Sequence, residues 1–156
     1  MKINFLLNGK ETEIEIEPDR RVIDLLREEC GLTGSKECCG AGECGACTIL
    51  VDGESRLSCL MLAAQLEGRE VITIEGLAKD GCFHVVQQAF VDYGAVQCGF
   101  CTPGMILAAV DLLRRNPTPS REQIREGISG NICRCTGYQK IVDAVYFASL
   151  ALQGVN

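Results

Sequence analysis

The stretch "KECCGAGECGACT" (residues 36–48) contains four cysteines separated by glycines and alanines. A protein with so many thiols in one short loop can use them in a disulfide knot, a zinc site, an iron–sulfur site or a reactive-thiol loop. The spacing of these cysteines, and the sequence on either side of them, distinguishes these four possibilities and with them the fold class.

The composition narrows the classes of function. The chain has 156 residues, enough for one ordinary domain or two small ones, and a net charge of −6, which argues against nucleic acid because phosphate binding needs a basic face. The longest uncharged stretch, residues 93–110, is shorter than the ~20 apolar residues of a membrane span, and nothing at the N-terminus reads as an export signal. We therefore expect a cytoplasmic protein, in which eleven cysteines favour metal binding over disulfides.

Residues 1–76 have a strand-rich pattern. Alternating apolar residues predict strands over 2–7 and 11–17, joined by the turn Asn8-Gly9, and a second hairpin lies around the turn Asp52-Gly53. The pattern also predicts a helix over 22–29, a short helical stretch over 61–66 and a last strand over 70–75. Strands around one helix indicate a small α+β domain.

Residues 77–156 have an all-helical pattern. Ser120, with Gln123 three residues later, forms a capping box, and Thr102 is predicted as the cap of another helix with Pro103 in its first turn. The helices predicted from these signals and from apolar periodicity span residues 83–94, 102–116, 120–129 and 138–152. Four helices of this length can form a bundle, and without a long linker the two halves are expected to pack on each other.

The cysteines of the first half have a recognisable spacing. Cys39, Cys44 and Cys47 form C-x4-C-x2-C, with Cys59 at a distance, which is typical of a plant-type [2Fe–2S] loop. The small residues between them let the backbone wrap closely around a flat cluster and point its N–H groups at sulfur. A zinc site is the alternative, although its usual signature is a pair of short C-x2–4-C knuckles.

The cysteines of the second half form two further pairs. Cys98 and Cys101 precede a predicted helix, whereas Cys133 and Cys135 follow one, so the fold can bring the pairs together at one end of the bundle. The C-x2-C and C-x-C spacings taken alone leave both zinc and iron–sulfur open.

Three segments, "GECGACTILVDG" (42–53), "QCGFCTPGM" (97–105) and "GNICRCTGYQKI" (130–141), resemble the signatures of the iron–sulfur subunit or domain of molybdenum hydroxylases of the xanthine dehydrogenase and aldehyde oxidase type. The resemblance covers nearly the whole chain. It implies a β-grasp ferredoxin-like domain over 1–76 and a four-helix-bundle domain over 77–156, each holding one [2Fe–2S] cluster.

The resemblance also implies residue roles. Molybdopterin would be contacted by Gln97 and Cys135, while the β-grasp cluster would face a flavin, and no catalytic residue is expected in this chain. Molybdopterin and FAD would belong to partner chains, a molybdenum-binding large subunit and an FAD-binding medium subunit. The implied ligands are Cys39, Cys44, Cys47 and Cys59 for the first cluster and Cys98, Cys101, Cys133 and Cys135 for the second.

The remaining candidate residues receive simpler interpretations. Cys38 departs from the family pattern, but it would give an x5 spacing, so the x4 spacing selects Cys39. Cys30 and Cys82 are interpreted as small buried apolar residues, and His84, the single histidine, as an ordinary helix residue.

The sequence therefore predicts an electron-transfer subunit that relays electrons from a molybdopterin centre to FAD. Xanthine or another purine is the first hypothesis for the substrate. The alternatives are the small subunit of another family member, acting on aldehydes, nicotinate, carbon monoxide or aromatic acyl-CoA, a free-standing ferredoxin, or a zinc-stapled structural module.

Overall fold

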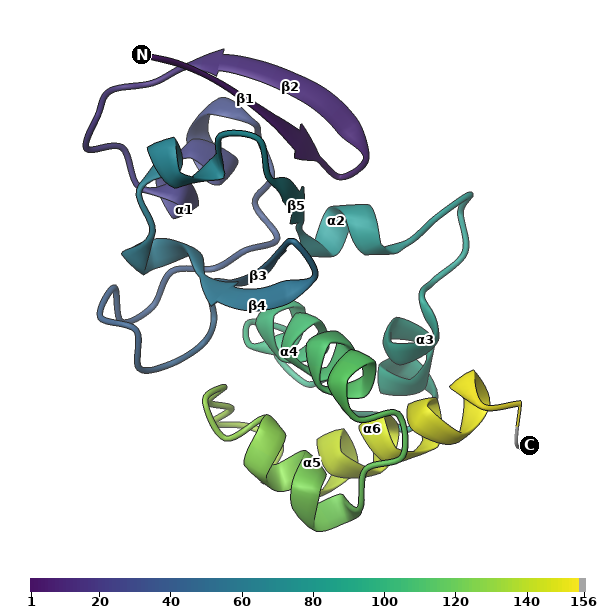
Figure 1. Ribbon diagram of the computed structural model, residues 1–156. Helices are drawn as coiled ribbons and strands as arrows, with labels where there is room; N and C mark the ends of the chain where they lie inside the picture. Colours follow the sequence, from purple (N-terminus) through teal and green to yellow (C-terminus); the bar gives the residue numbers. More distant parts are fainter. Residues whose placement is uncertain (155–156) are drawn as a thin grey trace.

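The computed structural model describes residues 1–154 and contains one mixed sheet above a group of helices (Figure 1). The sheet has the order β2-β1-β5-β3-β4, in which β1 and β5 run parallel and the other neighbours run antiparallel. Both predicted hairpin turns are confirmed, and all four turn residues have the positive φ that such tight hairpins require. The strands are β1 (Lys2–Leu7), β2 (Lys10–Glu15), β3 (Thr48–Val51), β4 (Glu54–Leu57) and β5 (Glu70–Ile72).

The helical turns of the first half differ in detail from the prediction. The helix predicted over 22–29 is confirmed as α1 (Val22–Asp24), continued by a π-helical turn over Leu25–Glu29. The predicted helical stretch 61–66 is reduced to a 3-10 turn over Ala63–Leu66. The strand predicted to reach residue 75 stops at Ile72, because the amide of Thr73 donates to Asn8 Oδ1 at 2.8 Å, and α2 (Ile74–Leu77) follows directly.

The second half contains the four predicted helices, but the N-cap of the second is Cys101 and not Thr102, which already lies inside the helix. The capping box is confirmed, since Ser120 Oγ accepts from Gln123 N at 3.2 Å and Ser120 N donates to Gln123 Oε1 at 2.9 Å. His84 is the N-cap at the start of its helix, with Nδ1 accepting from Val86 N at 3.2 Å, which agrees with its interpretation as a residue of this helix and refines its position. The helices are α3 (Val85–Asp92), α4 (Thr102–Arg115), α5 (Arg121–Gly127) and α6 (Gln139–Leu152).

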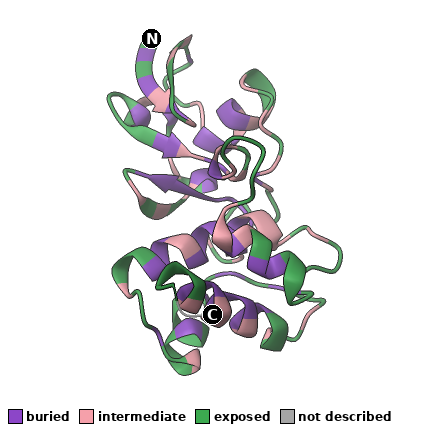
Figure 2. Cartoon of the chain, turned by 90° about the vertical axis from the view of Figure 1, so that its right-hand side faces the viewer, coloured by how far each residue is buried: buried purple, intermediate pink, exposed green. Residues whose placement is uncertain are grey.

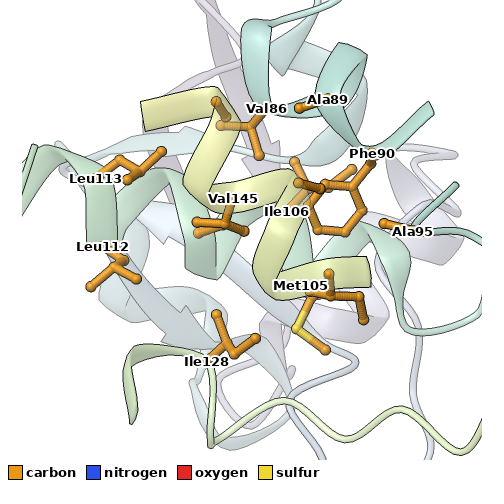
Figure 3. Packing of buried hydrophobic residues seen from close by; sticks show 14 of the residues in the cluster. Val86, Ala89, Phe90, Ala95, Met105, Ile106, Leu112, Leu113, Ile128 and Val145 are labelled. Carbon is orange, nitrogen blue, oxygen red and sulfur yellow. The ribbon is translucent and has the colours of Figure 1, made fainter. Parts of the chain in front are cut away.

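Each half has its own apolar core. In the first, α1 and its π-helical turn cover one side of the sheet, where Val22, Leu25 and Leu26 pack with strand residues such as Ile3 and Ile49. In the second, the four helices enclose a core that includes the residues Phe90, Met105, Ile106 and Val145 (Figure 3). Buried residues run through both halves, whereas many connecting loops are exposed (Figure 2). This division matches the predicted α+β domain followed by a helical domain.

The two halves pack on each other through α4, which lies against β3 and β4 (Figure 1). Leu50 of β3 belongs to the core of the helical half. Asp111 of α4 is 4% exposed and accepts from Ser55 of β4, from Oγ at 2.8 Å and from N at 3.2 Å. Arg114 adds a hydrogen bond from Nε to Gly53 O at 3.1 Å. The predicted packing of the halves is therefore confirmed.

Candidate iron–sulfur centres

The first cysteine loop connects the π-helical turn to β3 and is shaped by glycines. Gly42 and Gly45 have φ values of 78° and 71°, which other residues rarely adopt. A Cβ at Gly45 would lie 2.5 Å from Gly130 O, so the loop also approaches the helical half too closely for any side chain at this position. Cys39 is exposed and Cys44 half-buried, whereas Cys47 and Cys59 are buried.

The thiol of Cys39 has the electrostatic surroundings of a metal ligand. Cys39 Sγ accepts backbone N–H groups from Ala41 at 3.4 Å and from Glu43 at 3.3 Å. These backbone hydrogen bonds, with help from Cys44, lower the pKa of Cys39 to about 6. The thiolate is the form that binds metal, so the loop favours it. Cys38 also faces Cys44, and this contact raises the pKa of Cys38.

The other pair of the first half lies deeper. Cys47 and Cys59 form a small buried cluster with Ile23. Burial, the largest effect, raises the pKa of Cys47 to about 11, and the neighbouring Cys59 thiol contributes. Two thiolates placed here would repel each other in an apolar environment unless a cation lay between them.

The second site lies where the two cysteine pairs of the helical half meet. Cys98 Sγ lies 3.6 Å from Cys135 Sγ, and both residues are exposed. Cys101 contacts Cys133, and burial followed by this contact raises the pKa of Cys101 to about 12. Burial would also raise the pKa of Cys133, but hydrogen bonds from Thr136 outweigh it and lower the pKa. The structure thus brings Cys98, Cys101, Cys133 and Cys135 together.

The eight cysteines therefore meet as four close pairs, and this arrangement fits two [2Fe–2S] clusters. Each iron of such a cluster takes two thiolates and two bridging sulfides, so its ligands are needed in pairs around a flat rhomb. A zinc ion needs all four ligands around one point. The pairs are Cys39–Cys44, Cys47–Cys59, Cys98–Cys135 and Cys101–Cys133.

The remaining predicted residues lie outside these pairs. Gln97 is exposed beside Cys98, at the same surface as Cys135. Cys30 is half-buried and packs against the core of the first half, as predicted. Cys82 is exposed, so its interpretation as a buried apolar residue was wrong; its amide and carbonyl pair with Lys79 in a tight turn that leaves the side chain outside.

The two cysteine loops contact each other directly. Ile132 N donates to Cys44 O at 2.9 Å, and Asn131 Nδ2 donates to Gly45 O at 3.0 Å. Gly104 of α4 completes the contact, because a Cβ there would lie 2.4 Å from Gly45 O. Sequence reasoning did not identify Asn131 or Gly104 as site residues. The available signal was their position inside the motifs at 130–141 and 97–105.

Comparisons with known proteins agree with this geometry. Residues 5–78 match the family described as "2Fe-2S iron-sulfur cluster binding domain", and residues 73–146 match "[2Fe-2S] binding domain". The small FeS subunit of nicotinate dehydrogenase from Eubacterium barkeri is 53% identical over 146 residues, 94% of this chain and 93% of that one. The iron-sulfur-binding subunit of xanthine dehydrogenase from Escherichia coli O157:H7 is 51% identical over 92% of this chain and 91% of that one.

A solved structure leads to the same class. A chain of quinoline 2-oxidoreductase from Pseudomonas putida 86 is 46% identical, with a TM-score of 0.93 over 100% of this chain and 98% of that one. The chain therefore belongs to the iron–sulfur subunits of the molybdenum hydroxylases. It is an electron-transfer subunit with two [2Fe–2S]-binding domains, the non-catalytic iron–sulfur subunit of a molybdenum-dependent oxidoreductase. Within residues 1–154, no helix is both long and apolar enough to cross a membrane.

Proposed function

We propose that the four thiol pairs hold the two clusters, with Cys39, Cys44, Cys47 and Cys59 as ligands of the first and Cys98, Cys101, Cys133 and Cys135 as ligands of the second. The observation that carries this assignment is the pairing itself, together with the two backbone N–H groups that point at Cys39 Sγ. When bound, a [2Fe–2S] cluster accepts and returns one electron at a time. The domains that hold them are 1–76 and 77–156.

The exposure of the four cysteine pairs supports an electron relay through the two clusters. Each set has one pair near the surface, Cys39–Cys44 and Cys98–Cys135, and one deeper pair. Electrons can therefore enter at one surface and leave at another, across the contact between the two loops. By family likeness, the helical-domain surface receives them from molybdopterin, contacted by Gln97 and Cys135, and the β-grasp surface delivers them to FAD.

The surfaces around the exposed pairs suit partner subunits. Phe100 and Ile132 are 44% and 54% exposed beside the second site, and Leu60 is 60% exposed over the first loop. Apolar side chains at such positions are suited to an interface. The partners proposed here are a molybdenum-binding large subunit at the second site and an FAD-binding medium subunit at the first. The eleven free cysteines support a proposed location in the cytoplasm, which keeps thiols reduced.

The names of the relatives support a proposal for the substrate class. Nicotinate, xanthine and quinoline, named in the three relatives above, are all aromatic rings that contain nitrogen. The substrate proposed for the assembled enzyme is therefore a nitrogen heteroaromatic ring, with xanthine or another purine as the first candidate. Specificity resides in the molybdenum-binding subunit, since this chain contributes relay groups only.

Metal analysis tests the ligand assignment. The full chain should contain four irons and four acid-labile sulfides, as two clusters of the [2Fe–2S] type require. Reduction should give two distinguishable EPR signals, because the two sites lie in domains of different fold. Stoichiometric zinc, or a single iron pair, would contradict the assignment.

Purification with its partners tests the remaining proposal. The chain should co-purify with subunits that carry molybdopterin and FAD, and the complex should oxidise a nitrogen heteroaromatic compound when a panel of purines, pyridines, quinolines and aldehydes is screened. Activity confined to aldehydes would overturn the substrate class, and activity of this chain without partners would overturn the relay role.

A further inference from the structure

The thiol of Cys133 accepts hydrogen bonds from both the hydroxyl and the backbone N–H group of one residue, Thr136. Thr136 Oγ1 lies 3.1 Å from Cys133 Sγ, and Thr136 N lies 3.4 Å from the same sulfur. Cys39 also accepts two hydrogen bonds, but both come from backbone N–H groups. Cys133 is therefore a predicted ligand whose sulfur receives a hydrogen bond from a side-chain hydroxyl.

The hydroxyl of Thr136 is oriented for this role. Tyr138 N donates to Thr136 Oγ1 at 3.2 Å, so an acceptor site of the hydroxyl oxygen is occupied by an N–H group. A hydroxyl has one hydrogen to donate, and here it can point at the sulfur. The hydroxyl thus receives a hydrogen bond from one side and donates one on the other.

Tyr138 holds this arrangement from a strained position. Its φ is 69°, uncommon for a residue other than glycine, and its hydroxyl accepts from Cys133 N at 2.8 Å. Tyr138 therefore bonds the ligand residue through its side chain and the Thr136 hydroxyl through its backbone. The two hydrogen bonds fix the distance between Thr136 Oγ1 and Cys133 Sγ, and they give a reason for the unusual backbone conformation.

We propose that Thr136 is a positioning residue that raises the reduction potential of the helical-domain cluster through the hydrogen bond from its hydroxyl to Cys133 Sγ. Reduction adds one electron and negative charge to the cluster, part of it on the ligating sulfur, so a donor to that sulfur stabilises the reduced form more than the oxidised form. No covalent bond breaks, and the hydrogen stays on Thr136 Oγ1. The inference rests on the proposed ligand role of Cys133.

A redox titration of the full chain with its partner subunits, followed by EPR, tests the inference. In Thr136→Val the helical-domain cluster should become harder to reduce, by up to about tenfold in the equilibrium constant, which is about 59 mV for a one-electron couple. Thr136→Ser keeps the hydroxyl and should keep a potential close to that of the wild type. The β-grasp cluster in the same sample is the internal control and should not shift.

The outcomes separate this inference from the proposed function. If the wild-type chain lacks two [2Fe–2S] signals, the proposed function itself fails. If both signals are present and Thr136→Val leaves the helical-domain potential unchanged, only the inference is overturned. Loss of this cluster from both Thr136→Val and Thr136→Ala, with retention in Thr136→Ser, would also overturn it, because the hydroxyl would then be required for cluster binding and not for its potential.

Discussion

The backbone amide of Ile132 donates a hydrogen bond of 2.9 Å to the carbonyl of Cys44, and this bond joins the two cysteine loops. Cys44 is a predicted ligand of the first cluster, and Ile132 is covalently joined to Cys133, a predicted ligand of the second. A short path of covalent bonds and one hydrogen bond therefore connects the two sites. Residues that hold the loops together matter for the relay as well as for stability.

Asn131 is the first of these residues. It is buried, and its Nδ2 donates to Gly45 O at 3.0 Å and to Thr48 Oγ1 at 3.3 Å. Asn131→Ala should lower the free energy of unfolding by about 1–2 kcal/mol, seen as a lower melting temperature by circular dichroism. Asn116→Ala, which removes a partly exposed contact with Gln123, is the matched control and should change it by less than about 0.5 kcal/mol. Equal effects of the two variants would contradict a special role for Asn131.

Gly104 tests how closely the halves approach. In an ordinary helix, Gly→Ala stabilises by about 1 kcal/mol, but a Cβ at Gly104 would lie 2.4 Å from Gly45 O, a backbone atom. We therefore expect Gly104→Ala to destabilise by about 1–3 kcal/mol in spite of the better helix propensity. Gly130→Ala is the control, since a Cβ there would meet nothing within 4 Å. Thermal unfolding of both variants measures the difference, and a Gly104→Ala protein as stable as the wild type would contradict the close approach.

The elements that could be predicted from the sequence depend on neighbouring residues. The turn Asn8-Gly9 and the capping box of Ser120 with Gln123 are local, so they were found from the sequence. The end of the last strand was missed because it depends on a bond between Thr73 and Asn8, which are 65 residues apart. The contact of Asn131 with Gly45 spans 86 residues. Spacing therefore indicated the metal-binding motifs, whereas the contact between the two loops required the fold.

The lowered pKa of Asp111 predicts at which pH values its carboxylate stabilises the fold. Burial would raise its pKa, but hydrogen bonds from Ser55, Arg114 and Arg115 outweigh it and lower the pKa. A lowered pKa in the folded state contributes stability above the unfolded value of about 3.9, and this contribution is lost as the pH falls through the folded value. Asp111→Asn should therefore lower the free energy of unfolding by about 2 kcal/mol. This loss should be the same at pH 7 and at pH 5, as measured by urea unfolding.

One outcome of this urea-unfolding experiment would contradict the prediction. A gap between wild type and Asp111→Asn that narrows between pH 7 and pH 5 would mean that the carboxyl already takes up a proton there, and hence that its pKa is raised. Asp143→Asn is the control, because Asp143 pairs with Arg121 at 3.0 Å near the surface, where solvent weakens ion pairs. Asp143→Asn should lower the free energy of unfolding by less than Asp111→Asn does at both pH values.

Cys38 and Cys39 are adjacent and both exposed, so the number of residues between each of them and Cys44 decides which one can bind iron. Cys39 Sγ accepts N–H groups from Ala41 and Glu43, and ligation by Cys38 would displace the glycines from the cluster. Cys38→Ser should therefore keep four irons per chain, whereas Cys39→Ser should fall to about two, the content of one [2Fe–2S] cluster. Iron and sulfide analysis checks this, and the reverse pattern would make Cys38 the ligand.

Removal of the helical-domain cluster should interrupt the relay in the assembled enzyme. In Cys133→Ala, substrate should still reduce the molybdenum centre, but rapid mixing should bleach no flavin, because the path to the β-grasp domain is lost. Metal binding also contributes folding energy in a small domain, so a sizing experiment must show that the complex is intact. Cys82→Ala, which removes an exposed thiol outside the four pairs, is the control and should reduce its flavin normally. An assembled, cluster-depleted complex that reduces its flavin at the normal rate would refute the relay.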